Sequence, residues 1–375
     1  MNEAPRHTTA GSRPGFAPAD PHTDTLDLAS VRHGVEAVLH AFLDEKLQTI
    51  PHPRARPLVE HLRALVDAGG KRIRPVLCVI GWHAAGRRDT PPHVLHLAAA
   101  VELFHAGAMI HDDIIDRSTT RRGHPSAHHA LRTQFTASPG SAAGAWFGDS
   151  AALVLGDLAL SWSDQLLHRG RLDTAHLRAT HPLLDTLRTE ALTGCYVELL
   201  ATGHHNTDFE LALEINRLKS GRYTVERPLQ LGAVLGGADQ EVLDTCSAYA
   251  VPLGEAFQLR DDILGVFGDT PAMGKPSLGD LREGKPTPLL AAALSRADPG
   301  ARERLHRLVG DPHLDDDGAA AVREILITTG AREQMEQLIE AKRLEALAAL
   351  AEPALPEAVA TALRHMAEAV THRTA

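Results

Sequence analysis

The stretch Met109-Ile-His-Asp-Asp-Ile-Ile-Asp-Arg117 combines a helix-forming apolar pattern with three closely spaced aspartates. On a helix that advances about 100° per residue, Asp112, Asp113 and Asp116 project at roughly 0°, 100° and 40°, so their carboxylates crowd one face. Like charges at this spacing repel one another, and a cation between them relieves the repulsion. Mg²⁺ suits such a site because it takes one or two carboxylates and completes its shell with water and phosphate oxygens. A solvated acidic helix face is the common alternative for an isolated motif of this kind.

Two basic segments flank this helix. Upstream, Gly69-Gly-Lys-Arg-Ile-Arg-Pro75 has two glycines that free the backbone and a proline where a helix could start. Backbone amides at such a start, together with Lys71 and Arg74, offer a place for a phosphate or diphosphate. An ordinary helix–helix turn with surface cations explains this segment alone equally well. Downstream, the turn Arg121-Arg122-Gly123 follows the aspartates directly.

Composition points to a helical protein with no affinity for polyanions. The chain has 375 residues, of which 43% are hydrophobic and only 4% aromatic, and Ala and Leu abound, which favours helix over sheet. The net charge of -10 argues against binding to nucleic acid or to an anionic membrane surface. Cys78, Cys195 and Cys246 lack metal-ligand or disulfide spacing, so we expect a reduced, cytoplasmic setting.

The N-terminus and the apolar segments indicate neither a signal peptide nor a membrane span. Residues 1–25 are rich in Pro, Thr, His and Ala without an apolar core, which predicts a disordered tail ahead of one helical domain over 26–375. We expect the most hydrophobic region to be 142–162, and Asp149 and Asp157 interrupt it.

Apolar residues recur at helical spacing along the rest of the chain. This pattern predicts helices over 26–48, 58–67, 76–83, 93–117, 146–168, 177–200, 209–235, 240–267 and in parts of 319–373. The helix over 240–267 carries a second acidic pair in Phe257-Gln-Leu-Arg-Asp-Asp-Ile-Leu-Gly265. Polar loops with Gly274-Lys-Pro276 and Asp280-Leu-Arg-Glu-Gly-Lys-Pro-Thr287 follow it. No segment predicts a strand of convincing length.

Two Asp-Asp helices about 150 residues apart, with a Gly-Gly-Lys-Arg segment upstream and lysine loops between and after them, resemble the trans-isoprenyl diphosphate synthases. The likeness runs from about Leu58 to Leu290 and is strongest to bacterial geranylgeranyl diphosphate synthases. It implies a single all-α bundle whose two acidic helices face each other across a deep central cavity, usually in a homodimer. It also implies a prenyltransferase that joins an allylic diphosphate to isopentenyl diphosphate, both small-molecule substrates.

The resemblance assigns roles by motif. It implies three Mg²⁺ ions in the substrate-bound state, with Mn²⁺ as an alternative, and their carboxylate ligands would be Asp112, Asp113, Asp116, Asp261 and Asp262. The implied contacts to the allylic diphosphate are Arg121, Lys219, Gln258, Lys275 and Lys285. The implied pocket for isopentenyl diphosphate consists of Gly70, Lys71, Arg74, His105 and Arg122. The acidic residues and Lys219 are the expected catalytic set. Helix geometry independently places His105 within about 20° of the Asp112 face, although a histidine there is more often a satisfied core residue.

The chain departs from the family pattern at a few positions. Where the second motif usually has a third aspartate, this chain has Gly265. Water could replace that ligand, and Asp269 lies two turns beyond Asp261, next to the helix end. Cys195, Glu198 and Ser220 stand where Gln, Asp and Thr are usual. None of these changes removes a cationic contact, so we expect an active enzyme.

The Asp112 helix also suggests how long the product grows. Upstream on the same face, Ala108, Phe104 and Val101 lie about 6, 12 and 16 Å from Asp112 along the axis. In the family, bulky aromatics at the positions of Gly107 and Ala108 stop elongation early, so these small residues imply a tail beyond fifteen carbons, with Phe104 as a candidate floor. We therefore expect geranylgeranyl diphosphate as the main product. The alternatives are a farnesyl or longer-chain product, and a floor contributed by another helix.

Two rival functions fit parts of the pattern. A class I terpene cyclase also ionises a diphosphate at an aspartate-rich helix, but it needs no second diphosphate site such as the one suggested by Gly70 to Arg74. A non-catalytic partner subunit would keep the fold and only modulate a synthase. The intact first motif and the nearly full set of cations disfavour it.

Overall fold

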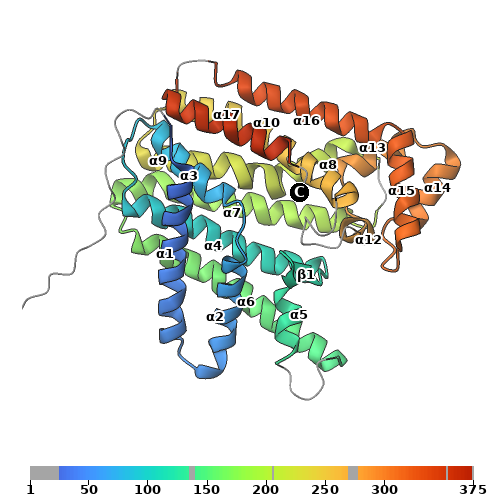
Figure 1. Cartoon of the computed structure of the whole chain (residues 1–375), viewed down its shortest axis with the longest axis horizontal. Coiled ribbons are helices and arrows are strands. Elements are labelled where there is room, and N and C mark those ends of the chain that lie inside the picture. The colour runs from blue at the N-terminus through green and yellow to red at the C-terminus, as the bar shows by residue number, and fades with distance from the viewer. Residues whose placement is uncertain (1–24, 135–139, 205–206, 269–277, 352–353, 374–375) are drawn as a thin grey trace, which may run out of the picture.

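Helices make up nearly all the regular structure of the part of the chain that the computed structural model describes (Figure 1), which comprises residues 25–134, 140–204, 207–268, 278–351 and 354–373. Nearly all of the predicted tail over 1–25 lies outside the described residues, and so do Asp269 and Lys275. The first half of the chain forms α1 (Leu28–Thr49), η1 (Pro53–Ala55), α2 (Arg56–Asp67), α3 (Ile73–Ala84), α4 (Pro92–Ile115), β1 (Thr120–Arg121), β2 (His124–Pro125), α5 (Ala127–Arg132), α6 (Ala142–Arg169) and α7 (Thr174–Ala201). The second half forms α8 (Phe209–Asn216), η2 (Arg217–Glu226), α9 (Arg227–Gly236), α10 (Gln240–Phe267), α12 (Gly279–Glu283), α13 (Pro288–Arg296), α14 (Pro299–Leu308), α15 (Asp316–Thr328), α16 (Ala331–Ala348) and α17 (Glu357–Thr371).

Side-chain caps fix where several of these helices begin. Asp27, Asp173 and Asp239 each accept a hydrogen bond from a backbone amide in the first turn of α1, α7 and α10. Such a cap satisfies one of the amides that a helix start leaves without a partner, and its loss typically costs about 1 kcal/mol. The predicted helices over 26–48, 177–200 and 240–267 are confirmed within two or three residues at their ends.

The helix α4 lies in the core and carries the first acidic motif at its C-terminal end. It packs against α6, α3 and α1, and its buried residues include Val94, Leu97, Leu103 and Ile110. We expected 142–162 to be the most hydrophobic region, and this was wrong, because α4 is the helix with the length and composition of a membrane span. Its most apolar window is 72% buried inside the protein, so its core position accounts for this composition.

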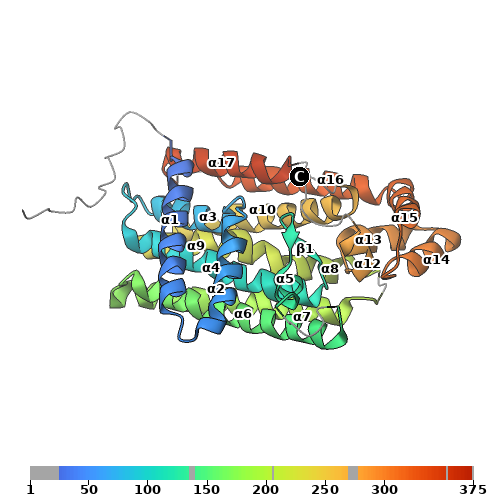
Figure 2. The same ribbon diagram turned by 60° about the horizontal axis from the view of Figure 1, so that its bottom comes forward.

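The other helices enclose α4 and α10 in one helical domain, as predicted. Helices α16 and α17 run along one long edge of the molecule beside α10, while α14 and α15 lie at one end (Figures 1 and 2). A hydrophobic cluster joins α3, α9, α10 and α17, and it includes Leu77, Leu229, Tyr249 and Leu363, all of which are fully buried. Hydrophobic burial of this extent is the main stabilising term of such a bundle.

The predicted single helix over 209–235 is wrong in its middle. The backbone stays helical, but over 217–226 it widens into π-helical turns between α8 and α9. This segment packs on α7 and α10 and carries Lys219, and wide turns of this kind often occur at functional sites. Pro228 lies in the first turn of α9, where its missing amide hydrogen is not needed.

A tight hairpin follows α4. The strands β1 and β2 pair antiparallel, with Arg121 opposite His124, and Arg122 and Gly123 form the two-residue turn between them. Both turn residues have positive φ angles, 51° and 77°, as a type I′ hairpin requires. The turn therefore fixes the backbone from which Arg121 and Arg122 project, directly after the aspartates.

Candidate active site

Each aspartate of the first motif meets a cation from a different part of the chain. The Nζ atom of Lys219 lies 2.9 Å from Oδ1 of Asp112, and Nζ of Lys285 lies 2.7 Å from Oδ2 of Asp116. Between them, Arg121 donates to Asp113, with its Nε atom 2.8 Å from Oδ1. The three carboxylates do crowd together as predicted, and basic side chains compensate their charge.

The electrostatics of the cluster differ from one carboxylate to the next. Burial disfavours the charged form of Asp112, but Lys219, Lys285 and Arg121 outweigh it and hold the pKa of this carboxyl well below its usual range. Burial and the neighbouring charge of Asp112 raise the pKa of Asp116. Asp113 is only 2% exposed and held by Arg121, so Asp112 and Asp116 are the carboxylates better placed for a metal ion.

Lys219 is held from two sides. In addition to its pairing with Asp112, its ammonium group donates to Oε2 of Glu198 on α7. Burial alone would lower the pKa of Lys219, but these two carboxylates raise it above its usual range. Glu198 was noted in the sequence only as a departure from the usual Asp, and the structure gives it the task of positioning Lys219.

Lys285 links the first acidic motif to the segment that follows the second. Its Nζ atom lies 2.7 Å from Oδ2 of Asp116, 3.1 Å from Oε2 of Glu283 and 3.5 Å from Oδ1 of Asp280. Despite burial, Asp280 and Asp116 raise the pKa of Lys285 well above its usual range. Asp280, Lys285 and Asp262 also line a common cavity, which brings the two acidic regions next to each other.

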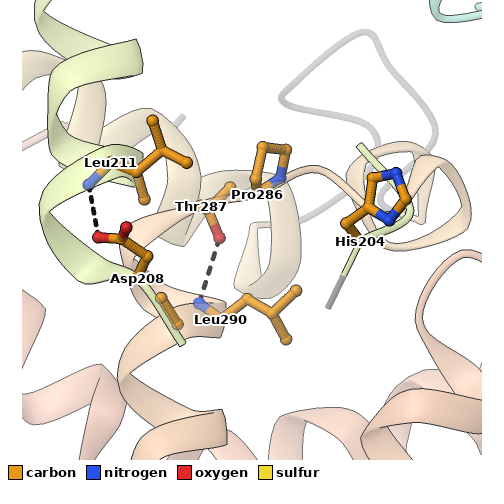
Figure 3. A pocket seen from close by; sticks show the side chains of 9 residues that line it. His204, Asp208, Leu211, Pro286, Thr287 and Leu290 are labelled. Atoms are coloured by element: carbon orange, nitrogen blue, oxygen red, sulfur yellow. Dashed lines mark hydrogen bonds between the residues drawn. The ribbon is translucent and has the colours of Figure 1, made fainter. Parts of the chain in front are cut away.

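A second pocket adjoins the segment that carries Lys285. It is lined by residues of the loop before α8 and the start of α13, among them His204, Asp208, Pro286 and Thr287 (Figure 3). Asp208 accepts a hydrogen bond from the amide of Leu211, and Thr287 caps α13 in the same way. These caps fix the starts of α8 and α13, the two helices that border the pocket.

The two aspartates of the second motif lie in different surroundings. Asp261 is 38% exposed and forms an ion pair with Arg373, which follows α17. Asp262 is 5% exposed and accepts hydrogen bonds from Nε2 of Gln258 at 3.0 Å and from Nδ2 of Asn216 at 2.9 Å. Burial raises the pKa of Asp262 to about 7. Asp261 is therefore the accessible carboxylate of the pair.

Several of the residues predicted to form the pocket for the second diphosphate lie close together. Arg74 donates to Oγ1 of Thr224 at 2.7 Å, and its guanidinium carbon lies 4.4 Å from the ring centre of Tyr223. The Tyr223 hydroxyl is hydrogen-bonded to Nδ1 of His105 at 2.9 Å. Burial and the charges of Arg74 and Arg122 lower the pKa of His105 well below its usual range, so its imidazole is neutral.

The glycine-rich segment shapes the edge of this pocket. Gly70 has a φ angle of 140°, and a Cβ atom there would lie 2.8 Å from Nη2 of Arg122. Arg122 in turn donates to the carbonyl oxygens of Gly69 and Leu65. Only glycine therefore allows Arg122 to approach this loop closely.

The cations of that segment have separate tasks. Arg72 is buried, and it donates to Oε1 of Glu102 and to the Val66 carbonyl, both at 2.7 Å. It anchors the loop, while Lys71 is exposed and Arg74 is half-buried. Neither Thr224 nor Tyr223 was predicted, and the only sequence signal for them is that they follow Lys219 on one segment.

The donor set of the acidic region fits Mg²⁺. All candidate ligands are carboxylate oxygens, the hard donors that this ion prefers. Within the described residues, no three His, Cys, Asp or Glu side chains form a group that could hold a metal by themselves. Mg²⁺ ions commonly bind through one or two carboxylates and complete their shell with substrate phosphates. The arrangement thus suits a metal site that substrate completes.

The residues predicted to measure product length lie upstream on α4. Phe104 is 5% exposed, its ring centre lies 5.9 Å from that of Tyr223, and the guanidinium carbon of Arg188 lies 5.8 Å from it. Val101, one turn deeper, is 2% exposed, and Ala108 is half-buried. Gly107 instead faces α6, where a Cβ atom would lie 3.0 Å from the carbonyl oxygen of Gly156. Its small size is needed for helix packing, so the length hypothesis depends on Ala108 and Phe104.

Comparisons with known proteins agree with this geometry. A family model described as polyprenyl synthetase matches residues 55–326. A crystal structure of geranylgeranyl pyrophosphate synthase from Corynebacterium glutamicum, complexed with isoprenyl diphosphate and magnesium, is 38% identical, with a TM-score of 0.89 over 93% of this chain and 100% of that one.

Curated relatives carry names with different product lengths. A short chain isoprenyl diphosphate synthase of Methanocaldococcus jannaschii is 31% identical over 76% of this chain and 80% of its own length. A (2E,6E)-farnesyl diphosphate synthase of Mycobacterium tuberculosis is 28% identical over 86% of this chain and 87% of its own length. The similar proteins thus share a reaction type and differ in product.

Proposed function

Because the chain belongs to the polyprenyl synthetase family of trans-prenyltransferases, we propose that it joins an allylic diphosphate head-to-tail to isopentenyl diphosphate, with geranylgeranyl diphosphate as its main product. One observation carries the proposal. Carboxylates gather around Asp112, whereas Arg74 and Arg122 lie near the neutral His105, so one diphosphate can be bound through metal ions and the other directly by cations. A diphosphate enters a buried site only if cations meet its charge.

The allylic diphosphate would bind at the acidic cluster. Mg²⁺ held by Asp112, Asp116 and Asp261 would act there as a Lewis acid on the leaving diphosphate. Lys219, Lys285 and Arg121, now paired with the aspartates, would turn to the phosphate oxygens and bind them directly. The protein thereby exchanges internal ion pairs for pairs with substrate.

Isopentenyl diphosphate would bind to Lys71, Arg74 and Arg122 beside the neutral His105. Its double bond would attack the allylic carbon as the C–O bond to diphosphate breaks, and apolar side chains along α4 would keep water from the cation. The condensation ends with the loss of a proton, which the released diphosphate would accept. No nucleophilic side chain is required.

The length of the product would be set along α4. Ala108 leaves room for a growing tail next to the diphosphate, and the Phe104 ring, braced by Tyr223 and Arg188, would form the floor. The name of the similar protein from Corynebacterium glutamicum supports a twenty-carbon product. The farnesyl synthase among the relatives makes a fifteen-carbon product the alternative.

A product-sizing experiment tests the proposal. The purified chain is incubated with Mg²⁺, isopentenyl diphosphate and, separately, dimethylallyl, geranyl and farnesyl diphosphate, and the products are sized. We expect twenty carbons from each primer, a shorter product from Ala108→Phe and a longer one from Phe104→Ala. Phe104→Leu, which removes less of the ring, serves as the graded control and should fall between the native chain and Phe104→Ala. Unchanged lengths in all three variants would show that the tail does not follow α4.

We also propose that the chain acts as a homodimer through α6 and α7, which both run along the bottom of Figure 2. Large apolar side chains are exposed on these two helices: Trp146, Leu153, Val154, Leu192, Tyr196, Leu199 and Leu200. A row of this kind marks an interaction surface. Light scattering should give about twice the chain mass of 40.3 kDa, and Leu153→Glu combined with Tyr196→Glu should give the monomer. A native chain that is monomeric at micromolar concentration would contradict this.

A further inference from the structure

The most informative departure from the expected motif is Gly265. It lies on α10 one turn after Asp261, where a third acidic side chain of the second motif would point toward the metal region. The space that a Cβ atom on residue 265 would take is already filled, because it would overlap with Oδ2 of Asp280 and lie 3.1 Å from its Cγ. Glycine at 265 is thus what allows the Asp280 carboxylate to lie against α10.

The surroundings of Asp280 point into the active site. Asp280 belongs to α12 and lines the cavity that also contains Asp262 and Lys285. Its Oδ1 atom lies 3.5 Å from Nζ of Lys285, which is a longer separation than the 2.7 Å between Lys285 and Asp116. Its negative charge also acts on Asp262, whose pKa it raises after the larger effect of burial. Asp280 therefore adds its negative charge to that of the second acidic motif.

We propose that Asp280 supplies the third carboxylate of the second acidic motif, reaching from α12 into the space that Gly265 leaves open on α10. It is a positioning residue that holds a metal ion of the second motif or a water molecule bound to that ion. Mg²⁺ retains several waters, so a carboxylate one water away still fixes its place. The inference rests on the proposed function, since it assumes that the second motif binds Mg²⁺.

A plain structural role for Asp280 is the competing explanation. In that case it would serve only as one of the counter-ions of Lys285, like Glu283, whose Oε2 atom lies 3.1 Å from the same ammonium group. The two explanations differ in what an aspartate at position 265 can do. If Asp280 positions a metal ion, an aspartate introduced on α10 at position 265 should restore the Mg²⁺ binding that is lost in Asp280→Ala. If Asp280 is only a counter-ion of Lys285, it should not.

Four variants of the full chain separate the explanations: Asp280→Ala, Gly265→Asp, the double variant Gly265→Asp/Asp280→Ala, and Glu283→Gln as the matched loss of another Lys285 counter-ion. Mg²⁺ binding is measured by titration calorimetry in the presence of a saturating, unreactive thiolodiphosphate analogue of the allylic substrate. Thermal unfolding in EDTA reports on folding of each variant.

We expect Asp280→Ala to weaken Mg²⁺ binding by about 10-fold or more, as is typical for residues that position metal ligands. The double variant should recover most of that loss. Gly265→Asp alone should unfold at lower temperature because its side chain overlaps with Asp280. Glu283→Gln should change Mg²⁺ binding much less than Asp280→Ala.

Other results would overturn the inference. These are unchanged Mg²⁺ binding in Asp280→Ala, no recovery in a double variant that folds like the native chain, or equal losses in Asp280→Ala and Glu283→Gln. Failure of the proposed function is seen separately, in a native chain that forms no prenyl diphosphate at all. A native chain that condenses its substrates while Asp280→Ala binds Mg²⁺ normally refutes only the role of Asp280.

Discussion

Replacing Lys219 by Met should destabilise the metal-free chain markedly, because it leaves two carboxylates without their shared cation. Lys219 lies between Asp112 and Glu198, and the three side chains are only 19%, 25% and 13% exposed. Breaking a fully buried ion pair costs about 3 to 5 kcal/mol, and because this pair is partly exposed we expect the lower value, about 3 kcal/mol. An unfolding entropy of about 0.8 kcal/mol per kelvin for a chain of this length converts that loss into a melting temperature lower by about 4 °C.

Calorimetry in EDTA measures this effect. The matched control is Arg56→Met, which removes a cation from an exposed pair with Glu60 and should cost less than about 1 kcal/mol. Adding Glu198→Gln to Lys219→Met should recover part of the stability, since one of the two unpaired charges is removed. If Lys219→Met melts no lower than Arg56→Met, the cation is not what holds the carboxylates together.

Three further predictions concern the rest of the site. Arg373→Ala removes the guanidinium that pairs with the second acidic motif, so titration calorimetry should show Mg²⁺ affinity rising by up to about fivefold, the equivalent of an exposed ion pair; unchanged or lower affinity would contradict it. The pKa of Asp262 is about 7 in the folded chain and about 3.9 in the unfolded chain, so between these pH values the folded state binds more protons. The stability of the metal-free chain should therefore fall as the pH rises from about 3.9 to about 7, by up to about 4 kcal/mol. Asp262→Asn should flatten that pH dependence in urea unfolding, and an identical pH profile would count against the shift. Gly70→Ala should raise the KM for isopentenyl diphosphate by displacing Arg122, whereas Gly69→Ala, with nothing within 4 Å of its Cβ, should leave that KM near the native value and cost only about 1 to 2 kcal/mol of stability.

Helices and charged motifs were predictable because their signals are local. Residues close together in the sequence encode the apolar period of α4, the cap at Asp239 and the spacing of Asp112 and Asp116. Periodicity and the resemblance together were enough to predict an all-α domain with two acidic helices. The short helices α5, α12 and α14 were not predicted, because they have too few turns for a period to stand out.

Contacts between distant segments could not be predicted in the same way. The widening of the helix around Lys219 depends on its packing against α7 and α10, which no local pattern encodes. Pairing of Arg373 with Asp261 and of Glu198 with Lys219 joins residues far apart in sequence. Gly265 looked like a lost ligand for the same reason, since only the fold brings Asp280 against it.

Gly107 shows how a correct pattern can have a different cause. A small residue at this position was taken as room for a product tail, but the structure places it against Gly156 and Leu160 of α6. Close packing of α4 on α6 therefore explains it without reference to product length. Ala108, its neighbour, is the residue on which the length prediction now depends.

The central claim is that one site binds two diphosphates and couples the cleavage of one to attack by the other. Release of inorganic diphosphate by the purified native chain tests it most directly, measured with geranyl diphosphate and Mg²⁺ in the presence and absence of isopentenyl diphosphate. The account predicts release only when both substrates and the metal are present, with one diphosphate formed for each five-carbon unit added. Equal release without isopentenyl diphosphate, with a hydrocarbon or alcohol as product, would contradict it and indicate a cyclase.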